Sequence, residues 1–348
     1  MKKVIASLIL AATLLTSLTA CGGEEKKGTT KEPTKPVESI VTEEPKPEPE
    51  LSVAEKTALG IEQVKALEVT FVAADDNDTL TYASSNPEVV ACDASTGALS
   101  GLALGNATIT ITSSVSGLSA TTEVVVTDPL KGATAAFFGD SICMASTWDK
   151  EHQWWGWAGR INEAYGLKSY VNKGVDGASL SDCRENNRIV KQVLGQKGNK
   201  FDFIVLHGGT NDGWDKVDVG TISQGFEPEG FDVSTFAGGL EELFYTAKKY
   251  FPKSNICYII NFRMNSDTGY LRDMSRYYKV AKAICKKWDI PYLDLYFDEE
   301  FCELFQYKTT KYLPDLIHPN SAGYDVLYPY IASFMRQTYY GINVQDLT

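Results

Sequence analysis

Histidine is scarce in this sequence, which has three copies among 348 residues: His152, His207 and His318. No two of them are spaced as paired metal ligands would be, and the seven cysteines include no Cys-x-x-Cys pair. The sequence therefore predicts neither a metal site nor another cofactor. Any chemistry that needs an imidazole as a base has only three residues to draw on.

Motifs for nucleotide binding are absent as well. There is no P-loop, and the segment at residues 172–177 lacks the first glycine of Gly-x-Gly-x-x-Gly. The Gly-x-Ser-x-Gly elbow of α/β-hydrolases is not formed around Ser141, because Cys143 stands where its second glycine would be. Positive charge is also in deficit. The net charge of −12 and the isoelectric point near 4.9 argue against a nucleic-acid partner and against docking on anionic lipid.

The apolar run near the N-terminus, residues 4–15, is too short for a confident membrane-spanning helix. Lys2 and Lys3 precede it and small residues follow it, which is typical of a secretory signal. Because a cysteine stands directly at the expected cleavage point, residues 1–21 resemble a bacterial lipoprotein signal, and this resemblance implies lipid on Cys21. We expect an exported protein, held at the outer face of the cytoplasmic membrane by this lipid alone.

Residues 22–50 read as an extended linker between the leader and the first folded domain. Five prolines recur there among Glu, Lys and Thr. Such a composition cannot bury enough apolar surface to offset the entropy lost on ordering, and proline keeps the chain extended. No chemistry is predicted for this segment.

Residues 51–128 have the pattern of a small β-sandwich. Apolar and polar residues alternate at 108–112 and 122–126, and turn residues such as Ser84 to Pro87 separate the runs. The stretches at 82–90 and 101–109 are similar to bacterial immunoglobulin-like group 2 domains. The sequence leaves two roles open for this domain, which are binding to wall or glycan and passive spacing.

After the joint at residues 128–132, strands alternate with helices in the pattern of a parallel sheet covered on both faces. We expect strands near Ala135, Tyr170 and Phe203 and at 256–261 and 292–296, with helices at 182–194, 235–250, 271–288 and 321–339. The alternation by itself does not rank the possible strand orders.

Polar residues follow the first of these strands at Gly139, Asp140 and Ser141. A residue at this place lies where the carboxyl end of a strand meets the start of a helix, which is where open α/β sheets bind their ligands. Ser141 is therefore a candidate nucleophile. Asp140 has a different expected task, which is to organise the turn by hydrogen bonding.

Three later polar blocks, at residues 172–177, 208–212 and 315–320, also follow strands or lie in a late loop. With the Gly-Asp-Ser stretch, and in this order, they resemble the SGNH (GDSL-type) hydrolase family, which is named for its Ser, Gly, Asn and His. The resemblance implies an α/β hydrolase domain over residues 133–342, with a flavodoxin-like parallel sheet of five strands in three layers.

The base is expected to be His318. It stands three residues after Asp315, and this spacing lets the carboxylate hold Nδ1–H while Nε2 faces the serine. His207 ends an apolar strand and is expected to be structural, and His152 has no comparable carboxylate arrangement. The resemblance gives Asp315 and His318 the roles of acid and base in a triad with Ser141.

The resemblance also implies an oxyanion hole made by the backbone N–H groups of Ser141 and Gly177 and by the side-chain amide of Asn211. Glycine lets the backbone approach a substrate closely, and an amide donates without ionising. For Gly174, in the same block as Gly177, the alternative to an oxyanion role is a role in the turn alone. Asp212 is expected to organise its loop by hydrogen bonding.

Several tryptophans follow the catalytic blocks and suggest a platform for sugar rings, with packing under long loops as the alternative. They are Trp148, Trp154, Trp155 and Trp157 after the serine, and Trp214 after Asn211. We predict substrate contacts for Trp148, Trp154, Trp155 and Trp214.

These observations predict a cell-surface serine esterase that deacetylates an O-acetylated carbohydrate through an acyl-enzyme. The alternatives are an esterase of the lipase or lysophospholipase type and a glycan-binding protein without activity. Apart from Cys21, six cysteines permit disulfides in an exported protein, but nothing demands them and their pairing stays open. Cys143 is expected to be a packed residue. The oligomeric state is also left open.

Overall fold

The computed structural model of the chain describes residues 47–145, 155–264 and 273–341. The predicted signal, the site of lipid at Cys21 and nearly all of the predicted linker lie outside the described residues. So do three residues singled out in the sequence, His152, Trp148 and Trp154.

The N-terminal domain is built from strands alone. They are β1 (Glu50–Val53), β2 (Lys56–Gly60), β3 (Val64–Ala66), β4 (Val69–Val72), β5 (Leu80–Ser84), β6 (Val90–Cys92), β7 (Ala98–Gly101), β8 (Gly105–Ser113) and β9 (Ser119–Thr127). Four of them form a sheet in the order β2-β9-β8-β5, three form a second sheet in the order β3-β7-β6, and β1 pairs with β4.

Alternation along β8 and β9 produces the core of this domain. Ile109 and Ile111 on β8 and Val124 and Val126 on β9 are buried, and the residues between them are more exposed. Successive side chains of a strand point to opposite faces, so the apolar set of each strand meets on one side. The predicted all-β immunoglobulin-like architecture is confirmed.

The second domain contains a five-stranded sheet. Its strands are β10 (Thr134–Phe138), β11 (Ser169–Asn172), β12 (Phe203–His207), β13 (Asn255–Ile260) and β14 (Tyr292–Asp294). Their order is β11-β10-β12-β13-β14, and every pairing is parallel. This is the flavodoxin-like order that the family resemblance implies, and the carboxyl ends of all five strands share one edge.

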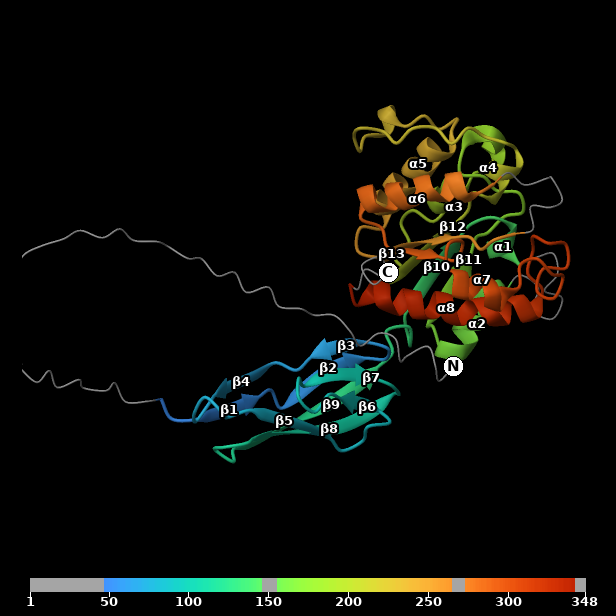
Figure 1. The fold of residues 1–348 in the computed structure, drawn as a ribbon. Helices are drawn as coiled ribbons and strands as arrows, with labels where there is room; N and C mark the ends of the chain where they lie inside the picture. Colours follow the sequence, from blue (N-terminus) through green and yellow to red (C-terminus); the bar gives the residue numbers. More distant parts are fainter. Residues whose placement is uncertain (1–46, 146–154, 265–272, 342–348) are drawn as a thin grey trace, which may run out of the picture. The chain divides into compact units, whose positions relative to one another are not determined.

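Helices cover both faces of this sheet (Figure 1). They are α1 (Ser141–Met144), α2 (Gly156–Tyr165), the 3₁₀ segment η2 (Asp182–Asn187), α3 (Ile189–Leu194), α4 (Thr210–Trp214), the 3₁₀ turn η3 (Pro228–Gly230), α5 (Phe236–Tyr250), α6 (Ser275–Trp288), α7 (Glu299–Phe305) and α8 (Ser321–Tyr339). α3, α5 and α6 lie on one face, and α2, α7 and α8 lie on the other.

Strand β10 supplies both cores by alternation. Ala136 and Phe138 pack with α3, α5 and α6, whereas Ala135 and Phe137 pack with α2 and α8. All four side chains are fully buried. A strand covered on both faces has no polar alternation, which is why β10 and β12 are continuous apolar runs in the sequence.

The helix predicted at 182–194 is two elements, so this prediction was wrong in detail. The chain breaks at Arg188, which has extended backbone angles and separates η2 from α3. The backbone there pairs with Ser179, since the Ile189 N–H donates to the Ser179 carbonyl at 2.9 Å. The buried Arg188 side chain also donates to the Leu180 carbonyl at 3.2 Å. These contacts to the preceding segment replace the helical hydrogen bonds that sequence periodicity favoured.

Among the residues that the structure describes, none of the helices has the length and apolar character needed to cross a bilayer.

Candidate active site

Ser141 is the first residue of α1 and directly follows the turn that ends β10. The Asp140 carboxylate caps this helix by accepting a hydrogen bond from the Ile142 N–H at 2.9 Å. Gln192 on α3 holds the turn from the other side, since it donates to the Gly139 carbonyl at 2.8 Å and accepts from the Gly139 N–H at 3.0 Å. These hydrogen bonds therefore fix the backbone on both sides of the turn that leads into Ser141.

The structure brings Ser141 and His318 together across 177 positions of sequence. The Ser141 Oγ lies 2.9 Å from His318 Nε2, and His318 Nδ1 lies 2.7 Å from the Asp315 Oδ2. With Nδ1–H donated to the carboxylate, Nε2 is left as an acceptor for the serine proton. The geometry expected from the Asp-x-x-His spacing is confirmed.

The loop that carries this pair closes on itself. The second carboxylate oxygen of Asp315 accepts from the backbone N–H groups of Ile317 and His318, at 3.0 and 2.7 Å. Leu316 has a φ of 67°, in the left-handed region that a leucine rarely adopts. Such strain persists only where surrounding contacts enforce it, and here it lets the carboxylate reach both the backbone and the ring.

Helix α8 joins this loop to the nucleophile. The buried Tyr324 hydroxyl on α8 donates to the Ile142 carbonyl of α1 at 2.7 Å. Arg160 on α2 donates to the Ser321 hydroxyl at 2.8 Å and pairs with Asp325, which ties α2 to the first turns of α8. His318 therefore meets Ser141 because the helix after it is anchored to the helix of the serine.

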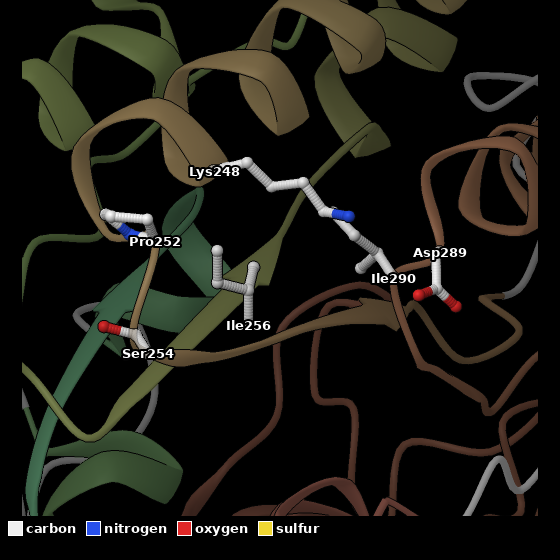
Figure 2. Close-up of a pocket in the computed structure, with 6 residues that line it drawn as sticks. All are labelled: Lys248, Pro252, Ser254, Ile256, Asp289 and Ile290. Carbon is white, nitrogen blue, oxygen red and sulfur yellow. The ribbon is translucent and has the colours of Figure 1, made fainter.

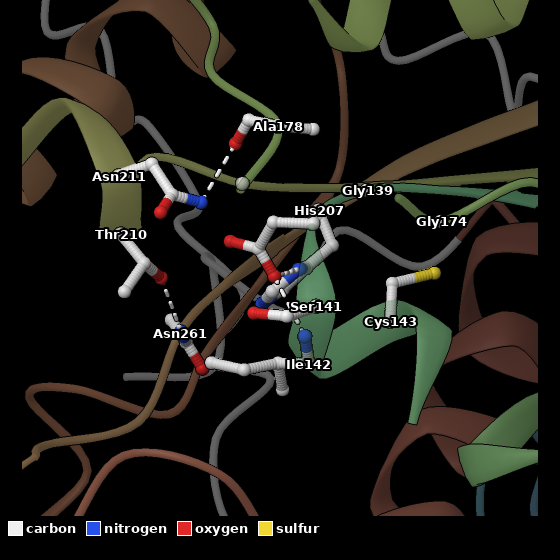
Figure 3. A network of polar contacts seen from close by, with 12 residues as sticks. Gly139, Ser141, Ile142, Cys143, Gly174, Ala178, His207, Thr210, Asn211 and Asn261 are labelled. Atoms are coloured by element: carbon white, nitrogen blue, oxygen red, sulfur yellow. Dashed lines mark hydrogen bonds and ion pairs between the residues drawn. The ribbon is translucent and has the colours of Figure 1, made fainter. Parts of the chain in front are cut away.

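The predicted oxyanion donors come from three segments. Ser141, as the first residue of α1, has a backbone N–H without an intrahelical acceptor. Gly177 has a φ of 71°, which favours glycine, and Asn211 is the second residue of α4. The Asn211 amide donates one hydrogen to the Ala178 carbonyl at 2.8 Å (Figure 3), so its second hydrogen is available for an oxyanion.

Asp140, which directly precedes the serine, and His207, the last residue of β12, are both buried. The two side chains are 3.4 Å apart, from His207 Nδ1 to Asp140 Oδ1, and Trp157 packs edge-on against the imidazole. Burial favours the protonated carboxyl, but the neighbouring His207 and the Ile142 N–H outweigh it and lower the pKa of Asp140. The capping role of Asp140 is confirmed. His207 is buried at the end of its strand, and its structural role stays a prediction.

Asp212 and Cys143 also lie where the sequence predicted, outside the proton path. Asp212 accepts from the N–H groups of Leu180 and Ser181, both at 2.9 Å, and so organises the segment after the Gly177 turn. Burial raises the pKa of the Cys143 thiol well above its usual value. Because only the thiolate is a strong nucleophile, Cys143 is a packed residue and not a second nucleophile.

Two of the predicted substrate tryptophans are described and both are exposed. Trp155 is 41% exposed before α2, and Trp214 is 39% exposed at the end of α4. Trp157, in contrast, is buried against His207. The described tryptophans therefore divide into the buried Trp157 and the exposed Trp155 and Trp214, and the substrate contacts of Trp148 and Trp154 stay predictions.

Sequence reasoning missed several residues that hold the site. Asn172 donates to the Cys143 carbonyl at 2.8 Å and accepts from the Gly174 N–H at 3.0 Å, which ties the end of β11 to α1. A Cβ atom at Gly174 would lie 2.6 Å from the Met144 backbone nitrogen, so this glycine serves the close approach of two backbones. Asn172 could have been found from the sequence, because it belongs to the same polar block as Gly177. Gln192 and Tyr324 stand in ordinary helical patterns, and nothing in the sequence marks them as site residues.

Six of the seven cysteines lie within the described residues. The six cysteines there are all free, so none of the disulfides that the sequence permits is formed. Within the same residues, no group of three or more His, Cys, Asp or Glu side chains is arranged to hold a metal ion.

A separate pocket of about 380 Å³ lies at the amino end of β13 (Figure 2). It is lined by Lys248, Pro252, Ser254, Ile256, Asp289 and Ile290. Since the strands are parallel, this is the end of the sheet opposite to Ser141. None of the predicted site residues lines it.

Comparison with known families agrees with this geometry. The sequence profile of the GDSL-like Lipase/Acylhydrolase family matches residues 137–326, which is more than half of the chain. The chain belongs to this family. The profile of the bacterial Ig-like domain (group 2) matches residues 52–124. A GDSL-type domain that hydrolyses esters therefore follows an immunoglobulin-like domain.

Among solved structures, the GDSL domain is similar to a Lactobacillus plantarum protein at 22% identity and a TM-score of 0.49, over 59% of this chain and 97% of that chain. It is similar to an acetyl xylan esterase from Geobacillus stearothermophilus at 22% identity and a TM-score of 0.43, over 59% and 95%. A Bacteroides ovatus protein described as a GDSL-like lipase matches at 17% identity and a TM-score of 0.44, over 59% and 98%. No curated protein matches the chain.

Proposed function

We propose that this GDSL-type esterase removes acetyl groups from O-acetylated carbohydrate, with Ser141 as the nucleophile, His318 as the general base and Asp315 as the residue that orients His318. The observation that carries the proposal is the continuous chain of hydrogen bonds from Ser141 through His318 to Asp315, at 2.9 and 2.7 Å. A serine hydroxyl is a weak nucleophile at neutral pH, and this chain removes its proton as the attack proceeds.

In the first half of the reaction, the Ser141 Oγ forms a bond to the ester carbonyl carbon, and its proton passes to His318 Nε2. The carbonyl π electrons move onto oxygen, which gives a tetrahedral oxyanion. Asp315 stabilises the imidazolium through Nδ1–H without taking the proton. The bond to the sugar oxygen then breaks, His318 returns its proton to that oxygen, and acetyl remains on Ser141.

In the second half, water replaces the sugar hydroxyl. His318 takes a proton from the water as its oxygen bonds to the acetyl carbon, and a second oxyanion forms. Breakdown of this intermediate breaks the bond to Ser141 Oγ, which regains its proton from His318, and acetate leaves. No oxidant, reductant or further reactant is needed.

The oxyanion is held by the N–H groups of Ser141 and Gly177 and by the Asn211 amide. Such donors act on charge that develops only in the transition state, and the loss of one typically costs about 3 to 4 kcal/mol of barrier. The Asn211 amide suits the task because its carbonyl oxygen and one of its hydrogens are already engaged, which leaves a single direction for the other hydrogen.

Carbohydrate is the proposed substrate because Trp155 and Trp214 are 41% and 39% exposed. Trp214 ends the short helix that carries Asn211, and the residue after Trp155 packs on α1, since a Cβ at Gly156 would lie 2.9 Å from the Ala145 Cβ. Aromatic rings give sugar rings a flat apolar surface. A site for long acyl chains would instead favour an aliphatic lining.

The test is acetate release from acetylated xylan, mannan, pectin and peptidoglycan, with the Ser141→Ala variant as control. We expect release from at least one polymer by the wild-type protein and none by the variant. Acetyl and octanoyl p-nitrophenyl esters separate the esterase alternatives, because a sugar deacetylase prefers the short chain. Faster octanoyl turnover, with no acetate from any polymer, would favour the lipase alternative, and esterase activity that survives Ser141→Ala would contradict the nucleophile.

The proposed location is the outer face of the cytoplasmic membrane, through lipid on Cys21. Its support is the sequence pattern of residues 1–21. Cells that express the full chain with a radioactive fatty acid should yield a labelled protein in the membrane fraction, and Cys21→Ala should abolish the label. A labelled Cys21→Ala protein would contradict this assignment.

A further inference from the structure

The turn that carries Gly177 is held by side chains that bind three successive backbone carbonyls. Asn187 donates to the Asp176 carbonyl at 2.6 Å, and Arg184 Nη1 donates to the Gly177 carbonyl at 3.0 Å. Asn211 donates to the Ala178 carbonyl at 2.8 Å. Arg184 and Asn187 both belong to η2, the segment that the sequence predicted to be part of an ordinary helix.

The bond from Asn187 sets the direction of the Gly177 N–H. The Asp176 carbonyl and the Gly177 N–H belong to one planar trans peptide group, so they point in opposite directions. Beside a glycine with positive φ, such a peptide group can rotate at low cost because no Cβ opposes it. Holding the Asp176 carbonyl toward Asn187 keeps the Gly177 N–H on the opposite side of the peptide group, in one fixed direction.

The bond from Arg184 sets the direction of the Asn211 amide. Arg184 Nη1 lies 3.1 Å from Asn211 Oδ1, and a guanidinium has donors only. The amide must therefore turn its oxygen toward Arg184 and its nitrogen away from it. A reversed amide would set the Asn211 NH₂ against the guanidinium and point an oxygen at the oxyanion.

Arg184 is itself fixed in place. Its Nε and Nη2 bind the two carboxylate oxygens of Asp215 at 2.6 and 2.9 Å, and Asp215 directly follows α4, which carries Asn211. Its backbone leaves the helical region within η2, with φ −127° and ψ 63°. Bidentate pairing of this kind fixes the plane of a guanidinium, so each of the three nitrogens of Arg184 has an assigned partner.

We propose that Arg184 and Asn187 are positioning residues that preorganise the oxyanion hole, Arg184 through Asn211 and Gly177 and Asn187 through the Gly177 peptide group. The inference rests on the proposed function, since it takes Gly177 and Asn211 as the oxyanion donors. Both residues act on the donors and not on the reacting atoms. Preorganised donors need no rearrangement as charge develops, which is why their orientation affects the rate.

The first test is Arg184→Met, which keeps the length of the side chain and removes its donors. With p-nitrophenyl acetate we expect kcat to fall about tenfold to hundredfold, as for other supporting residues, while KM stays within about twofold. Lys191→Met is the matched control, because it removes the same charge from an exposed side chain, whose ion pair in the described residues is with the exposed Glu185. This control should keep wild-type kcat.

The second test asks whether Arg184 acts through Asn211. In the Asn211→Ala background, Arg184→Met should cost clearly less than in the wild type, because the amide that it orients is gone. An equal loss in both backgrounds would overturn the action of Arg184 through Asn211. A higher KM with unchanged kcat would overturn the whole proposal, because it would mark a substrate contact. Arg184→Lys should recover part of the rate, since one ammonium can still donate to Asn211 or Gly177.

Asn187→Ala gives an independent measurement if the Arg184 variants fold poorly. It should lower kcat without changing KM, and its loss should multiply with that of Asn211→Ala, because it acts on the other donor. Wild-type kcat in a folded Asn187→Ala protein would overturn its role. If Asn211→Ala itself left kcat unchanged, the oxyanion hole of the proposed function would fail. If only the Arg184 and Asn187 variants had no effect, this inference alone would fail.

Discussion

The loop that carries Asp315 and His318 and the turn that carries Gly177 position their groups in different ways. The loop is closed by contacts among four consecutive residues, with one carboxylate bound to two backbone N–H groups and to the ring. The turn is held by side chains from later parts of the chain, since Arg184 lies 7 residues after Gly177, Asn187 lies 11 after Asp176 and Asn211 lies 33 after Ala178. The Asp315–His318 loop is the local half of the site, held by contacts between near neighbours. The Gly177 turn is the distributed half, because it depends on tertiary packing.

This difference decides what a mutation does. Removal of a contact within the Asp315 loop damages the proton path directly, since the same carboxylate orients both backbone and ring. Removal of a contact around the Gly177 turn leaves the donors present but badly aimed. We therefore expect mutations in the Asp315–His318 loop to lower kcat most, and mutations around the Gly177 turn to lower kcat by smaller, graded amounts.

The largest expected effect is that of Asp315→Asn, which breaks the local half. Asparagine has one accepting oxygen, which cannot serve both the two backbone N–H groups and the Nδ1–H of His318 as the two carboxylate oxygens do. With the oxygen on the backbone, the amide nitrogen faces the ring and the tautomer is lost, so we expect kcat to fall about 10³-fold to 10⁴-fold. Turnover of p-nitrophenyl acetate measures this. Asp289→Asn, which changes an exposed carboxylate directly after α6 at the end of the sheet opposite to Ser141, is the control and should stay within about twofold. Retention of a tenth of wild-type kcat by Asp315→Asn would contradict the assigned role.

Asn211→Ala probes the distributed half and should have the next largest effect. It removes one oxyanion donor, so we expect kcat to fall about 10²-fold to 10³-fold with little change in KM. Steady-state kinetics with p-nitrophenyl acetate separate the two parameters. A change confined to KM would assign Asn211 to ground-state binding of the substrate.

Gly177→Ala sharpens the comparison, because it disturbs the turn without removing a donor. A Cβ there would lie 2.7 Å from Arg184 Nη1, and the φ of 71° strains any L residue. We expect kcat to fall about tenfold and the free energy of unfolding to fall by about 1 to 2 kcal/mol.

Gly166→Ala is the matched control for this variant. Gly166 has a φ of 69°, and a Cβ there would meet nothing within 4 Å. It should lower stability by a similar amount and leave kcat unchanged. Equal kcat values for Gly177→Ala and the wild type would show that the turn tolerates displacement of Arg184.

The smallest expected effect is that of Asp215→Asn on stability. The hydrogen bond from Arg184 lowers the pKa of Asp215 against the opposing effect of burial. A lowered pKa in the folded state means that the stabilisation is present above the unfolded pKa of about 3.9 and is lost as the pH falls through the folded value. At pH 7 we expect a loss of about 0.5 to 1 kcal/mol, and a smaller loss at pH 3.

Urea unfolding followed by tryptophan fluorescence measures this difference, because all six tryptophans lie within residues 133–342. A difference between Asp215→Asn and the wild type that grows toward pH 3 would contradict the sign of the shift.

The strands were predicted correctly where both faces of the strand are buried. β10, β12 and β13 are covered on both faces, so their apolar runs carry a direct signal. η2 was missed because the residues at 182–194 suit a helix, and only the pairing of Ser179 with Arg188 breaks it. That pairing is a contact with another segment and leaves no mark on local periodicity.

The sequence by itself determined the two domain classes, the nucleophile turn and the Asp-x-x-His unit, because these depend on alternation, turn residues and spacing along a few neighbouring residues. Only the tertiary structure decided that His318 reaches Ser141, since this depends on the Tyr324 hydroxyl binding the carbonyl of Ile142. It also decided how the Gly177 peptide group and the Asn211 amide are aimed. Hydrogen bonds are directional and short, so partners far apart in the chain become visible only when the fold has placed them.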